Sequence, residues 1–110
     1  MDTALDALDA ILQTITDEPS AIRQGYCRLS HALYTFITHT TTINALDATT
    51  TEIERQLRLD ESLSTDQKDR IIALSKTMDY YKFHHHPMHT RAALTNTIHN
   101  IRQLMEAMAS

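Results

Sequence analysis

The fold is decided by residues 22–46, which read IRQGYCRLSHALYTFITHTTTINAL. Apolar or threonine side chains recur there at alternating spacings of four and three residues, at Ile22, Tyr26, Leu29, Leu33, Phe36, Thr40 and Ile43. That alternation is typical of a helix that packs one side against other helices. Between Gly25 and Pro87 the chain contains no further glycine or proline. The stretch therefore predicts a long central helix in an all-α protein.

Beyond Ile43 the apolar pattern shifts by one step of three residues and continues through Leu46, Thr50, Ile53 and Leu57. Such a slip indicates either a kink or a break. The threonine triplets at 40–42 and 49–51 are weak helix formers, and Thr49 with Glu52 matches a capping box that would start a new helix. The sequence favours one long helix over 20–59, straight or kinked, and leaves a separate helix over 51–59 as the alternative.

Three further helices are predicted on either side of this element. The first covers 2–16, with Leu5, Leu8, Leu12 and Ile15 on its apolar side, and the next helix has Pro19 as its first residue. Another covers 65–83 after a capping box of Ser64 and Gln67, and the last covers 87–108 after a turn at 84–87. The prediction is a single helical domain over 1–110: a three- to four-helix bundle with one long central helix and coiled-coil-like packing.

Composition excludes several classes of protein. With 1 Gly and 2 Pro in 110 residues, turn-dense β-folds and glycine-rich phosphate loops are excluded. The single Cys forbids an internal disulfide and favours a reducing compartment, so a cytoplasmic location is expected. Residues 29–46 carry no Asp, Glu, Lys or Arg, but their many Ser, Thr, His and Asn side chains argue against a membrane span. Acidic residues near the start of the chain argue against a signal peptide.

The central helix has a second uncharged side. Positions that normally point to water and carry Lys or Glu are occupied here by other residues, namely Cys27, His31, Tyr34, Thr38 and Thr41, and Ile37 widens the apolar area beside them. We predict that these six residues form a surface for a protein partner or for a second copy of the chain. The alternative is that other helices of the same chain cover them. The predicted function is a non-enzymatic interaction or assembly protein, such as an adaptor, a chaperone-like protein or a small structural subunit.

A second hypothesis is contact with nucleic acid. Aromatic and basic side chains alternate near the end of the 65–83 helix, at Tyr80, Lys82 and Phe83, and Arg91 follows. Such a pattern can stack on bases and neutralise phosphates. The net charge of −4 argues against a protein devoted to nucleic acid, so a small subunit of a nucleoprotein complex is the form this hypothesis takes.

A third hypothesis is a transition-metal site at His84, His85, His86 and His89, because imidazole is a common ligand of Zn, Ni and Cu. Pro87 stands between His85 and His89, and the single Cys is distant in sequence, so a solvated loop is favoured over a metal site. The sequence holds no Glu-x-x-His or His-Glu-x-x-His motif. We therefore predict neither a cofactor nor catalysis.

Overall fold

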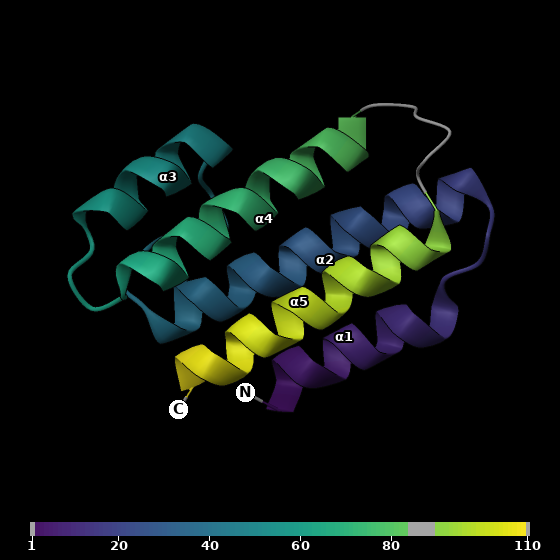
Figure 1. Cartoon of the computed structure of the whole chain (residues 1–110), viewed down its shortest axis with the longest axis horizontal. Helices are drawn as coiled ribbons and strands as arrows, with labels where there is room; N and C mark the ends of the chain where they lie inside the picture. Colours follow the sequence, from purple (N-terminus) through teal and green to yellow (C-terminus); the bar gives the residue numbers. More distant parts are fainter. Residues whose placement is uncertain (1, 84–89, 110) are drawn as a thin grey trace.

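The computed structural model of the chain, which describes residues 2–83 and 90–109, is all-helical and compact (Figure 1). Within those residues there are five helices and no strands: α1 (Asp2–Thr14), α2 (Pro19–Thr40), α3 (Thr50–Leu59), α4 (Thr65–Phe83) and α5 (Arg91–Ala109). The helices α1, α2, α4 and α5 pack side by side, and successive members of this group run in opposite directions (Figure 1). Both α1 and α4 contact α2 and α5, and α2 also contacts α5 across the group.

Helix α2 contributes the largest share of the core. Its predicted apolar positions from Ile22 to Phe36 are all buried, whereas Thr40 is exposed. Gly25 lies on the same side and faces Leu94 of α5 and Ile15 beyond α1. The Tyr26 ring stacks on Tyr81 of α4, with centroids 4.6 Å apart and an angle of 6° between the planes. Helix α2 therefore contributes strongly to the core, and it contacts α1, α4 and α5.

The prediction that this helix continues to residue 59 is wrong. Helix α2 ends at Thr40, and the backbone of Thr41 is extended. Threonine hydroxyls satisfy the backbone groups that the break exposes: Thr38 accepts from the amide of Ala45, and Thr41 accepts from that of Ile43, both at 3.1 Å. The alternative of a separate helix is the correct one, and as a result the described residues form more helices than the predicted three or four.

Side-chain caps place the starts of the later helices. The amide of Glu52 donates to the Thr49 hydroxyl at the start of α3. Both hydrogen bonds of the Ser64 and Gln67 capping box are present at the start of α4, each 3.1 Å long. Helix α5 begins at Arg91, where the Thr90 hydroxyl accepts from the amide of Ala93. The predicted turn at 84–87 lies outside the described residues.

Helix α3 lies at the edge of the molecule, beside α4 (Figure 1). Among the described helices it contacts α4 alone. It contributes Ile53 and Leu57 to the core, while Leu59 at its end is 75% exposed. In the connection that precedes it, Ala45 is buried and Leu46 is exposed, so the predicted apolar pattern does not hold at Leu46.

Candidate functional site: a groove between α1 and α2

One strip of side chains along α2 is open to solvent over much of its length. It consists of residues four apart, Cys27, His31, Thr35 and His39, of which Thr35 is half-buried and the other three are exposed. Residues at this spacing lie above one another on the same side of a helix. The strip therefore forms a continuous band along most of α2.

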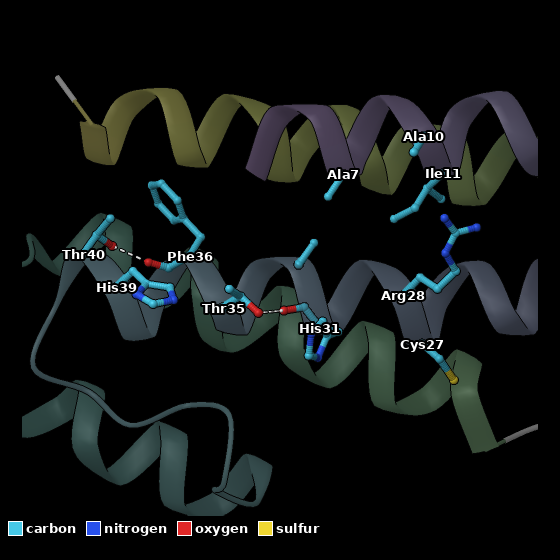
Figure 2. Close-up of a pocket in the computed structure, with 11 residues that line it drawn as sticks. Ala7, Ala10, Ile11, Cys27, Arg28, His31, Thr35, Phe36, His39 and Thr40 are labelled. Atoms are coloured by element: carbon cyan, nitrogen blue, oxygen red, sulfur yellow. Dashed lines mark hydrogen bonds between the residues drawn. The ribbon is translucent and has the colours of Figure 1, made fainter. Parts of the chain in front are cut away.

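Beside this strip, a groove of about 760 Å³ lies between α1 and α2 (Figure 2). Its apolar part is lined by Ala7, Ala10 and Ile11 from α1 and by Ala32 and Phe36 from α2. Three of these five side chains are alanines, which leave space where larger residues would bring the two helices into full contact. The apolar lining thus has small residues on both helices, with Ile11 and Phe36 as its larger side chains.

The rim of the groove is polar and carries basic groups. Arg28, His31 and His39 line it, and none of its eleven lining residues is acidic. The guanidinium of Arg28 donates from Nη1 to the Thr14 hydroxyl at 2.9 Å, which links the two helices at one end of the groove. Asp9, an acidic residue of α1, is ion-paired with Arg102 of α5.

The threonines on the rim direct their hydroxyl protons to their own helix. Thr35 donates to the carbonyl of His31 and Thr40 to that of Phe36, both at 2.7 Å (Figure 2). Their oxygen atoms remain available as acceptors. The groove therefore combines an apolar floor with hydroxyl oxygens, two imidazoles and one guanidinium along its edge.

The structure divides the predicted partner surface in two. Cys27 and His31 are exposed and line the groove. The other four residues contact or lie close to elements of the same chain: Ile37 is fully buried, and the hydroxyls of Thr38 and Thr41 bond the connection to α3. For those residues the structure matches the alternative in which the chain covers its own helix.

Tyr34 belongs to a polar cluster with Thr50, Ser75 and Asp79, where α2, α3 and α4 meet. The Thr50 hydroxyl donates to Asp79, which fixes the start of α3 on α4. Burial raises the pKa of Tyr34, the nearby hydroxyl of Ser75 offsets part of that rise, and the charge of Asp79 adds to it. Ionisation of Tyr34 is therefore disfavoured, and the hydroxyls of Tyr34 and Ser75 are buried without a hydrogen-bond partner among the described residues, beside the Thr50–Asp79 bond.

The residues of the nucleic-acid hypothesis lie at the end of α4 and the start of α5. Tyr80 is 45% exposed, and the edge of its ring meets Tyr81 at a centroid distance of 5.6 Å. Lys82 and Phe83 fall in the last turn of α4. Arg91 is exposed and lines a shallow cleft with Asp17 and His99. Contact with nucleic acid stays a prediction.

The metal hypothesis concerns residues that the structure does not describe, because His84, His85, His86 and His89 lie outside 2–83 and 90–109. Within those two ranges, no group of three or more His, Cys, Asp or Glu side chains is arranged to hold a metal ion. Cys27 and His31, one turn apart on α2, supply only two donors of this kind.

Several groove residues were missed in the sequence. Arg28, Ala32, Thr35, Phe36 and His39 lie on α2, and the four-residue spacing from Cys27 to His39 is a signal that could have found the exposed strip. The α1 half, Ala7, Ala10 and Ile11, has no such signal, because which side of α1 borders the groove depends on how that helix packs.

No family model matches the chain, and no curated protein or solved structure shows significant similarity to it. Of the helices in the described part of the chain, none has both the length and the apolar character that crossing a membrane requires.

Proposed function

We propose that the chain is a non-enzymatic interaction protein, and that the groove between α1 and α2 takes up a segment of a protein partner. The observation that supports this proposal is the groove itself, with its apolar floor and an exposed polar strip alongside. An apolar groove with polar groups on its rim is one of the recurring sites at which proteins take up an amphipathic peptide segment. A cytoplasmic adaptor or small subunit, with coiled-coil-like packing of its own helices, is consistent with the 4–3 spacing on α2 and with the single cysteine.

The partner surface in this proposal differs from the one expected from the sequence. It keeps Cys27 and His31, and it adds the side of α1 that carries Ala7 and Ala10. Tyr34, Ile37, Thr38 and Thr41 are left out of the proposed surface, because Ile37 is buried and the hydroxyls of Thr38 and Thr41 accept from amides of the connection to α3. A substitution such as Tyr34→Glu would therefore disturb the fold as well as any interface.

The test fills the groove without changing the core. Ala10 is half-buried on the groove side of α1, so a tryptophan there occupies the space between the helices. Ala73→Trp, at an exposed position on α4, is the matched control. Helical peptides are selected from a displayed library on the wild-type chain, and their affinities for both variants are then measured by fluorescence anisotropy.

We expect selected peptides to lose at least about tenfold in affinity for Ala10→Trp, because a filled pocket excludes an anchoring side chain, and to keep their affinity for Ala73→Trp. Circular dichroism of both variants confirms that helicity is retained. Equal binding to wild type and Ala10→Trp, or a library that yields no binder, would contradict the proposal.

A further inference from the structure

We infer that the segment taken up by the groove is an amphipathic helix with acidic side chains beside its apolar stripe. This inference rests on the proposed docking function and adds the chemistry of the partner. Three features of the groove carry it: its length along α2, its open wall, and the sign of the charges on its rim.

The length of the groove suits a helix. On α2 it extends from Cys27 to Thr40, which corresponds to about 20 Å at the helical rise per residue. A partner helix of three to four turns would lie along that length. Its apolar residues, three and four apart, would meet the floor formed by Ala7, Ala32 and Phe36.

The open wall favours a helix over a small molecule. Cys27, His31 and His39 are exposed, so an occupant of the groove keeps one side in water. An apolar small molecule would leave much of its own surface solvated there, whereas small-molecule sites usually bury most of the ligand. An amphipathic helix presents its polar side to water and its apolar side to the floor.

The charge on the rim selects the polar residues of the partner. Arg28 is the charged group of the lining, and it lies about 4.5 Å along the helix axis from the imidazole of His31 and about 17 Å from that of His39. Of the five N–H donors of Arg28, one is used by Thr14 in the described structure. Carboxylates flanking the apolar stripe of a partner helix would meet these groups without competition from acidic residues in the lining.

The same charges argue against a second copy as the occupant. In a symmetric dimer the same patch contacts itself. Both copies of Arg28 would then lie in one interface to which the groove lining supplies no carboxylate. The rim is therefore complementary to an acidic partner rather than to itself.

The inference is tested with three synthetic helical peptides of about 16 residues that share one leucine stripe and carry Glu, Gln or Lys at all flanking positions. Binding to the full chain is measured by fluorescence anisotropy at low and at high salt. We expect the Glu peptide to bind about tenfold more tightly than the Gln peptide at low salt, the Lys peptide to bind most weakly, and the differences to shrink at high salt.

Substitutions on the rim of the groove test which residues cause the preference for the Glu peptide. Arg28→Gln combined with His31→Gln should remove most of the preference for Glu over Gln, while Arg55→Gln, an exposed site on α3, should leave it unchanged. Circular dichroism confirms that each variant is folded.

The outcomes separate this inference from the proposed function. If the Glu and Gln peptides bind equally and both are lost with Ala10→Trp, the acidic preference is overturned and the docking groove stands. If no peptide binds the wild-type chain, both are overturned. A dimer in light scattering that Ala10→Trp dissociates would identify a second copy as the occupant and overturn the acidic partner.

Discussion

Gly25 is a residue at which two helices approach closely. A β-carbon at this position would lie 2.5 Å from Cδ2 of Leu94 and 3.3 Å from Cγ2 of Ile15. Leu94 is fully buried, so it has little room to move away. Glycine is normally unfavourable within a helix. Here the absence of a side chain allows α2 and α5 to pack together.

We expect Gly25→Ala to lower the free energy of unfolding by about 1 kcal/mol, because overpacking a core costs about 1–3 kcal/mol and outweighs the better helix propensity of alanine. Urea unfolding followed by circular dichroism measures the change. Gln24→Ala, at an exposed neighbouring position, is the control and should be neutral or slightly stabilising. In a Leu94→Ala background the Gly25 substitution should no longer destabilise. A loss of the same size in that background would show that the contact is not the cause.

Tyr26 makes the stability of the protein sensitive to alkaline pH. Burial raises the pKa of its hydroxyl from 10.0 to about 12, Thr97 offsets part of this rise, and Tyr81 adds to it. Because the folded-state pKa lies above that of the unfolded chain, the contribution to stability is fully present below pH 10.0 and is lost as pH rises toward about 12.

The expected outcome is that the free energy of unfolding of the wild type falls over this alkaline range, and that it falls less in Tyr26→Phe, which has no phenol to ionise. Urea unfolding at a series of pH values gives the comparison. Tyr80→Phe, at an exposed tyrosine, is the control and should follow the wild type. Parallel curves for Tyr26→Phe and the wild type would rule out Tyr26 as the source.

At the scale of the element, α3 is the helix with the fewest packed neighbours in the described part of the chain. It contacts only α4 among the described helices, and the hydrogen bond from Thr50 to Asp79 fixes its first turn there. Elements with few packed neighbours open locally before the rest of a protein unfolds. The amides of α3 should therefore exchange with solvent faster than those of α2.

Thr50→Val preserves the shape of the side chain but removes the donor to Asp79. We expect this substitution to lower the free energy of local opening of α3 by about 1 kcal/mol, the usual net value of a hydrogen bond. Native-state hydrogen exchange of the α3 amides measures it. Thr51→Val changes an exposed neighbour and should have little effect. Unchanged exchange in Thr50→Val would mean that the hydrogen bond to Asp79 does not hold the helix in place.

The elements also show where reasoning from the sequence succeeds. Apolar periodicity predicted α1, α4 and α5 to within a few residues where the structure describes them, because each buries one continuous side. It extended α2 too far, because the pattern continues with a single slip through 40–57. The break after α2 is stabilised by hydrogen bonds between threonine hydroxyls and backbone amides, such as the bond from the Ala45 amide to Thr38. The spacing of apolar residues carries no information about such bonds.

At the scale of the whole molecule, the sequence predicts part of the α2 wall of the candidate site but not its α1 wall. The uncharged side of α2 is visible in the sequence, and it led to Cys27 and His31. Which part of that side stays exposed depends on how the rest of the chain packs on it, and this packing leaves Ile37 fully buried and Tyr34 half-buried. The opposite wall of the groove depends on the rotation of α1 about its axis, which is set by tertiary contacts.

The position of α5 has a consequence for how the chain folds as it is synthesised. This helix contacts α1, α2 and α4, and it supplies Leu94, Ile98, Ile101, Leu104 and Met105 to the core. The four helices before it leave the ribosome first, and until α5 follows, the apolar side of α2 that faces it remains in water. The nascent chain is therefore expected to stay loosely packed until α5 emerges.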